Sequence, residues 1–69
     1  MKLSARNILK GIVVKIVRGA VNDEVTLQLP GGEQIVSIIT EGSVKALELK
    51  EGKEAYAVIK ASSVMIAVD

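Results

Sequence analysis

Most of the chain alternates between short apolar runs and turn-forming residues, a pattern typical of β-structure. Residues 25–29 alternate strictly between apolar and polar side chains, the period of a strand with one buried face. Gly11 lies inside the first apolar run, and a glycine within a strand predicts a bend or bulge. Pro30-Gly31-Gly32 predicts a hairpin turn. The pattern predicts five strands, which cover residues 8–17, 25–29, 35–40, 55–60 and 64–68.

The segment between the third and fourth predicted strands has a different character. Residues 43–49 lack alternation and place Val44 and Leu47 three positions apart, a helical spacing. Ser43 is predicted to cap this short helix by accepting a backbone hydrogen bond. An SH3-like barrel and an open meander offer no natural place for such a helix. We therefore predict one all-β domain over residues 1–69, a five-stranded OB-like barrel with one short helix between strands three and four.

Both faces of several predicted strands are apolar. Ile12, Val14 and Ile16 point away from Val13 and Val17, because successive side chains of a strand alternate between faces. A monomeric barrel hides only its inner face, and 49% of the residues are apolar. A domain of this size buries only roughly 60% of its unfolded surface. The sequence therefore predicts a homo-oligomer.

Composition excludes several classes of function. The chain has no Cys and no His, so disulfides, the usual zinc sites and the familiar nucleophilic catalytic groups cannot form. We expect no enzyme activity and no direct protein–metal ligands. No apolar run has the roughly 18 residues of a membrane span, and the N-terminus lacks the apolar stretch of a secretory signal. We therefore expect a cytoplasmic protein without membrane contact.

Nucleic-acid binding is the main alternative that an OB-like fold raises. Such modules stack bases on aromatic side chains along a basic groove, yet the net charge is +1 and Tyr56 is the single aromatic residue. We therefore expect no nucleic-acid partner. An OB-type nucleic-acid-binding module stays the second hypothesis, and a purely structural assembly domain is the third.

Three short segments at predicted strand ends carry the remaining chemistry. Residues 4–7, 40–43 and 60–63 combine small hydroxyls with basic side chains. A tetrahedral oxyanion needs fixed positive charge, neutral hydroxyl donors and free main-chain amides. Each segment also has an ordinary explanation: a frayed terminus, a helix cap, or a solubilising lysine. The leading ligand candidates are Ser4, Arg6, Thr40, Ser43 and Lys60.

The sequence resembles a known family over nearly its whole length. The residues that carry the resemblance are Leu3-Ser4-Ala5-Arg6-Asn7 with Leu9-Lys10-Gly11, Ile38-Ile39-Thr40 with Ser43-Val44, Leu49-Lys50-Glu51-Gly52-Lys53-Glu54, and Ile59-Lys60-Ala61-Ser62-Ser63-Val64-Met65. They are similar to the motifs of the molbindin (Mop) family. These small proteins bind molybdate, and their domain recurs in molybdate-responsive regulators and in importer ATPase subunits.

The resemblance implies a function and a set of site residues. It implies storage and intracellular homeostasis of molybdate or tungstate, bound without an organic cofactor at the subunit interfaces of a hexamer built from dimers. Thr40 and Ser43 would come from a neighbouring chain, and Asn7 would act structurally. Gly19, Ala20 and Val21 would contribute to a second class of site. In the main site, the residues from one chain would be Ser4, Ala5, Arg6, Lys60, Ala61 and Ser62.

Overall fold

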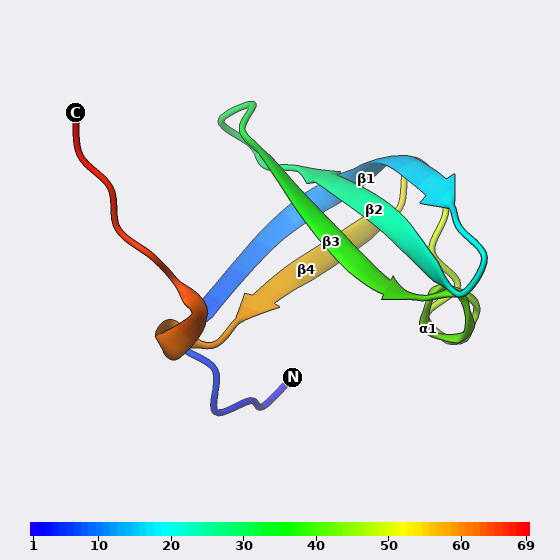
Figure 1. The fold of residues 1–69 in the computed structure, drawn as a ribbon, viewed down its shortest axis with the longest axis horizontal. Helices are drawn as coiled ribbons and strands as arrows, with labels where there is room; N and C mark the ends of the chain where they lie inside the picture. Colours follow the sequence, from blue (N-terminus) through cyan, green and yellow to red (C-terminus); the bar gives the residue numbers. More distant parts are fainter.

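A computed structural model describes all 69 residues as one antiparallel sheet with a short helix (Figure 1). The sheet has four strands in the order β3-β2-β1-β4, and each neighbouring pair is antiparallel. The elements are β1 (Asn7–Arg18), β2 (Asn22–Gln28), β3 (Gln34–Thr40), α1 (Glu41–Ala46), β4 (Glu54–Ile59) and a 3₁₀ turn, η1 (Ala61–Ser63). The first four predicted strands are therefore confirmed, with their ends shifted by a few residues.

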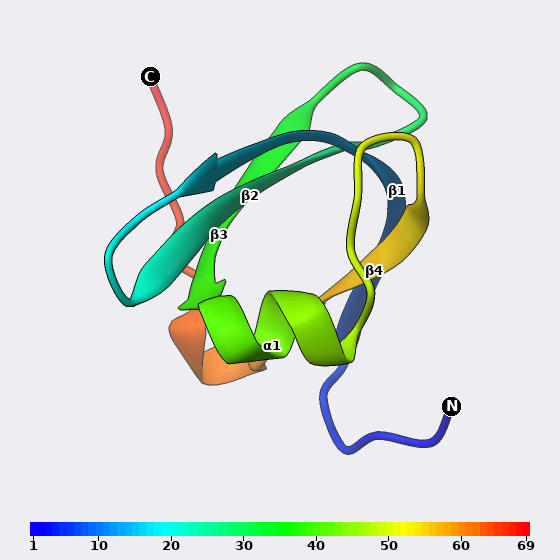
Figure 2. The same cartoon turned by 90° about the vertical axis from the view of Figure 1, so that its right-hand side faces the viewer.

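The sheet curls into a half-barrel because β1 is shared between two partners. Its first half, Asn7–Ile12, pairs with β4, and its second half, Ile12–Arg18, pairs with β2. Gly11 is buried where β1 passes from one partner to the other, and an added Cβ there would stand 2.8 Å from the backbone oxygen of Gln28. The register also shifts between Val13 and Lys15. β1 changes its pairing partner next to Gly11, and Figure 2 shows the curl of the sheet with α1 below it.

The core lies inside the curl and is small. It consists of the buried side chains Val13, Val25, Leu27 and Val44. Val44 is the only buried residue of α1, so one helical side chain closes the end of the half-barrel. Five half-buried residues pack against this core: Ile16, Ile39, Leu49, Ala55 and Ala57.

Backbone hydrogen bonds close the hairpin turn between β2 and β3, and an ion pair joins β1 to β4. In the hairpin, Leu29 N donates to Glu33 O at 2.8 Å and Gly32 N donates to Leu29 O at 2.9 Å, so the predicted turn is confirmed. Lys10 Nζ lies 2.9 Å from a carboxylate oxygen of Glu54, and this hydrogen bond raises the pKa of Lys10. Both side chains are exposed, so the ion pair contributes little to stability.

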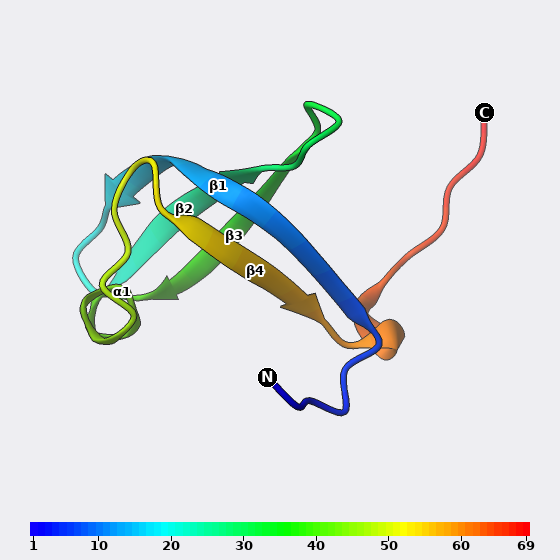
Figure 3. The same cartoon turned by 180° about the vertical axis from the view of Figure 1, so that it is seen from behind.

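The predicted fifth strand is wrong, and the five-stranded barrel with it. Residues 64–68 pair with no strand, and every residue from Val64 to Asp69 is exposed. An apolar segment has a tendency to form a strand, but a strand also needs hydrogen bonds to the backbone of a neighbouring strand. The segment instead leaves η1 and projects away from the sheet (Figure 3). No helix of the structure has the length and apolar character that a membrane span requires.

Candidate oxyanion-binding site

Two of the three predicted segments leave the sheet at the same end. Asn7, the first residue of β1, pairs with Ile59, the last residue of β4, and Asn7 Nδ2 donates to Ile59 O at 3.3 Å. This contact gives Asn7 a structural role. Residues 4–6 precede β1 and residues 60–62 follow β4, so both emerge beside this pair (Figures 1 and 3). We call these six residues the β1–β4 cluster.

The β1–β4 cluster presents two cations without acidic partners. The ion pairs of the structure are Lys10–Glu54 and Lys45–Glu41, so neither Arg6 nor Lys60 is neutralised by a carboxylate. Both side chains are exposed, as are Ser4 and Ser62. Arg6 offers a planar fork of donors, and Lys60 offers a compact charge. The turn η1 shapes the second half of the cluster, because Ser63 N donates to Lys60 O at 2.9 Å.

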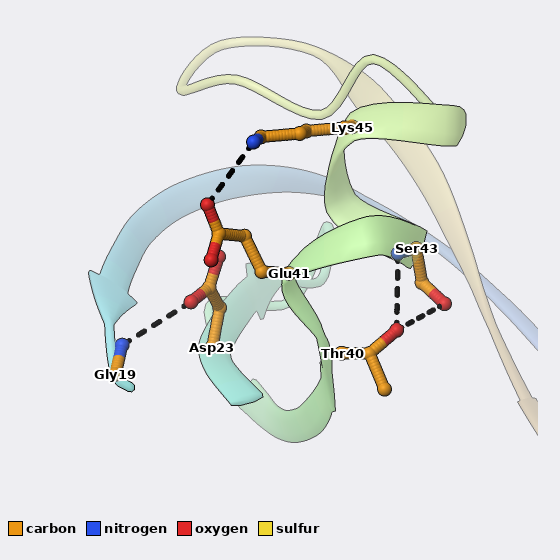
Figure 4. A network of polar contacts seen from close by, with 6 residues as sticks. All are labelled: Gly19, Asp23, Thr40, Glu41, Ser43 and Lys45. Carbon is orange, nitrogen blue, oxygen red and sulfur yellow. Dashed lines mark hydrogen bonds and ion pairs between the residues drawn. The ribbon is translucent and has the colours of Figure 1, made fainter. Parts of the chain in front are cut away.

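The third predicted segment forms the start of α1. Thr40 Oγ1 accepts from Ser43 N at 3.1 Å and donates to Ser43 Oγ at 2.9 Å (Figure 4). Thr40 is therefore the N-cap, and the prediction that Ser43 caps the helix is wrong. The helix begins two residues before Ser43, at Glu41, because Thr40 stays extended and supplies the capping oxygen. With Thr40 as the donor between the two hydroxyls, the Ser43 proton remains available to another acceptor.

The predicted second site, the turn of residues 19–21, lies beside the start of α1. Gly19 N donates to Asp23 Oδ1 at 3.2 Å (Figure 4), and Glu41 N donates to Val21 O at 3.0 Å. Asp23 is fully buried, and its Oδ2 has no hydrogen-bond partner. The sequence analysis did not identify this role of Asp23. No spacing in the sequence indicates that this acid is buried under the turn that it holds.

Within one copy, the β1–β4 cluster and the Thr40–Ser43 segment lie at opposite ends of the sheet. One end is defined by the pair Asn7 and Ile59, and the other by the pair Asn22 and Thr40. Figures 1 and 3 show the same separation, with η1 and α1 at opposite sides of the molecule. A single copy therefore does not bring all the predicted ligands together.

The structure holds no group of acidic side chains arranged for a metal ion. Two surface hollows of about 620 Å³ each also lie outside the predicted site. One is lined by Glu48, Lys50, Glu51, Gly52 and Lys53, where two carboxylates offset the charge of the two lysines. The chemistry for an oxyanion is concentrated in the β1–β4 cluster and at the start of α1.

The Thr40 cap gives a first testable prediction. Thr40→Val should lower the free energy of unfolding by about 1 kcal/mol, because the Ser43 N–H loses its acceptor. Ser43→Ala is the matched control, since it removes one hydroxyl but leaves the capping bond to Thr40 intact. Urea unfolding at fixed protein concentration measures both. Equal losses in the two variants would contradict the assignment of the cap to Thr40.

Comparisons with known proteins agree with the architecture and identify its class. Residues 3–66 match the model of the TOBE domain. A probable molybdenum-pterin-binding protein of Haemophilus influenzae is 52% identical over 69 residues, which is the full length of both chains. Molybdenum-pterin-binding protein 1 of Clostridium pasteurianum is 52% identical over 66 residues, covering 96% of this chain and 97% of the relative. The relatives are thus binding proteins by name.

Solved structures share the same fold. MopII from Clostridium pasteurianum superposes with a TM-score of 0.92 at 49% identity and covers 97% of this chain and 100% of its own. The cytoplasmic molybdate-binding protein ModG, in a form with molybdate bound, gives a TM-score of 0.91 at 57% identity. That match covers 94% of this chain and 46% of ModG. The chain belongs to the TOBE-domain family of small molybdenum-pterin-binding (Mop) proteins.

Proposed function

We propose that this protein binds molybdate or tungstate reversibly and without covalent bonds, as a store and buffer of the oxyanion. The observation that carries the proposal is the pair of unneutralised cations, Arg6 and Lys60, held beside hydroxyls at one end of the sheet. Support also comes from ModG, which is 57% identical and has a structure with molybdate bound. Cationic and hydroxyl donors together replace the water around a doubly charged oxyanion.

We propose the inorganic oxyanion itself, rather than an organic cofactor, as the ligand. Several relatives carry pterin in their names, but a pterin ring would need an apolar or aromatic slot. Tyr56 is the only aromatic residue, and it stands 51% exposed on β4. The β1–β4 cluster consists of two serines, two alanines, one arginine and one lysine, and it has no large apolar or aromatic side chain. These suit a compact anion.

The proposed sites lie between subunits of a homo-oligomer, a hexamer built from dimers. One copy would contribute the β1–β4 cluster, and its neighbour would contribute Thr40 and Ser43. This arrangement accounts for two donor groups that lie at opposite ends of each copy. A second class of site would use residues 19–21, in the turn that Asp23 holds. Two crystal structures of ModG suggest a cooperative binding mechanism for that protein, which would fit sites shared between copies.

The cellular role that we propose is oxyanion homeostasis in the cytoplasm, the compartment of ModG. A store must release the anion as well as capture it, and non-covalent contacts allow both. The chain also lacks Cys and His, the residues of many common catalytic groups. A nucleic-acid-binding role is disfavoured because one exposed Tyr56 cannot form a row of stacking side chains.

Titration of the full chain with sodium molybdate tests this function directly. We expect saturable binding of molybdate and tungstate by calorimetry, and much weaker binding of sulfate, whose charge is the same but whose size differs. Native mass spectrometry of the same samples reports subunit number and bound anions together. A parallel titration with single-stranded oligonucleotides should show no steeply salt-dependent binding. Binding of oligonucleotide without binding of molybdate would favour the nucleic-acid alternative.

A further inference from the structure

Asp23 is the only charged residue that the fold encloses completely. Its Oδ1 accepts from Gly19 N at 3.2 Å, its Oδ2 has no hydrogen-bond partner, and none of its surface is exposed. An enclosed charge without a partner lowers the stability of a fold. The bond to Gly19 does not account for this charge, because the neutral amide oxygen of an asparagine would accept it equally well. The charge of Asp23 therefore needs a role other than holding the turn.

No cation neutralises Asp23 within the copy. The neighbouring acid, Glu41, has its own partner, because Lys45 Nζ lies 3.2 Å from Glu41 Oε1. In Figure 4 the side chains of Asp23 and Glu41 point toward one another, with Lys45 on the far side of Glu41. Arg18 stands opposite Asp23 in the β1–β2 ladder, but it is exposed and forms no ion pair. One uncompensated negative charge is therefore fixed next to the turn of residues 19–21.

The turn itself carries two unused hydrogen-bond donors. Neither the Ala20 N–H nor the Val21 N–H takes part in a hydrogen bond within the chain, and both residues are exposed. Successive free amides of this kind can bind an anion. The Gly19 N–H, by contrast, is already occupied by Asp23. An anion on this turn would thus meet two neutral donors and, close to them, the charge of Asp23.

We propose that Asp23 sets the charge selectivity of the second class of oxyanion site, so that the turn of residues 19–21 binds singly charged tetrahedral anions in preference to molybdate. Coulomb repulsion is proportional to the charge of the ligand, so a dianion is repelled twice as strongly as a monoanion of equal size. The low dielectric around an enclosed carboxylate strengthens the repulsion. The main site has the opposite balance, because Arg6 and Lys60 both attract a dianion. This selectivity rests on the proposed function, which places a second class of site at the turn.

A neutral substitution of the same shape isolates the charge. Asp23→Asn keeps an oxygen for Gly19 N and can present its amide nitrogen to Glu41, so the variant should be at least as stable as the original chain. Glu24→Gln is the matched control, because it removes the same charge from the next residue of β2, whose side chain points to the opposite face. Glu24 is half-buried and forms no ion pair. Thermal melts at one protein concentration compare the folding of both variants.

Backbone amide chemical shifts of ¹⁵N-labelled protein report occupancy of the turn independently of the main site. The amides of Ala20 and Val21 are followed during titrations with sodium molybdate and with sodium perrhenate, a tetrahedral monoanion of similar size. In the original chain, perrhenate should shift these amides at lower concentration than molybdate does. Asp23→Asn should lower the dissociation constant at the turn about tenfold for molybdate and only about threefold for perrhenate. Glu24→Gln should change either constant by less than about twofold.

Tighter binding of molybdate than of perrhenate at the turn of the original chain would overturn the role of Asp23, and this comparison needs no variant. Equal gains for the two anions in Asp23→Asn, or equal gains in Glu24→Gln, would overturn it as well. If calorimetry detects molybdate binding while neither anion shifts the turn amides, only the inference about Asp23 fails. If perrhenate shifts the turn amides but molybdate binds nowhere else on the chain, the main site of the proposed function fails instead.

Discussion

Arg6→Ala and Lys60→Ala should each weaken molybdate binding about tenfold to a hundredfold. Each removes a charged donor from the β1–β4 cluster, and a hydrogen bond to a charged group is worth about 1.5–3 kcal/mol, where about 1.4 kcal/mol corresponds to a factor of ten. Neither side chain forms an ion pair within the copy, so its removal leaves no carboxylate unpaired and should leave folding unchanged. Calorimetric titration of each variant with molybdate gives the affinity directly.

The matched control is Lys15→Ala. Lys15 is an exposed cation on β1 that also forms no ion pair, but it lies outside the proposed site. The Lys15→Ala substitution lowers the net charge by the same amount as Arg6→Ala or Lys60→Ala, so it measures any general electrostatic effect on anion binding. Lys15→Ala should bind molybdate with the affinity of the original chain within about twofold, since distant exposed charges are screened by salt. If Arg6→Ala and Lys60→Ala both bound molybdate with unchanged affinity, the β1–β4 cluster would not be the binding site.

Gly11→Val should destabilise the fold more than any other substitution proposed above. A Cβ at this position meets the Gln28 carbonyl oxygen at 2.8 Å and its carbon at 3.3 Å, and both are backbone atoms of the paired strand. Backbone cannot rotate away as a side chain can, so β1 and β2 must separate. Overpacking typically costs about 1–3 kcal/mol, and we expect a loss at or above the upper end. For a domain of this size, this lowers the melting temperature by about 12–24 °C.

Gly42→Ala provides the control for the glycine substitution. An added Cβ at Gly42 meets only Thr40 Oγ1, at 3.9 Å, which is ordinary contact. The residue lies in α1, where alanine is favoured over glycine by about 1 kcal/mol, so the melting temperature should stay constant or rise. Thermal melts must use one protein concentration, because assembly couples to apparent stability. A Gly11→Val protein as stable as Gly42→Ala would contradict the close approach of β1 to β2.

The local features of the chain could be predicted from its sequence. The alternation around residues 25–29 predicted β2, the glycine-rich turn after Pro30 predicted the hairpin, and Gly11 predicted the bend of β1. The strand and the hairpin are confirmed, and Gly11 lies where an added Cβ would meet the backbone of Gln28. These features depend on neighbours in the sequence, through side-chain period and turn chemistry. The oxyanion site predicted at residues 4–6, 40–43 and 60–62 was inferred from residue types at strand ends, and it stays a prediction.

Tertiary structure decided which of these parts meet. The sequence placed a strand at residues 64–68, but the ladder that would pair with it is absent from the single copy. It placed the helix cap on Ser43, whereas the extended end of β3 makes Thr40 the cap. The pairing of Asn7 with Ile59 put residues 4–6 beside residues 60–62 and left Thr40 at the far end. Strand pairing is a contact between residues distant in sequence, so local patterns cannot specify it.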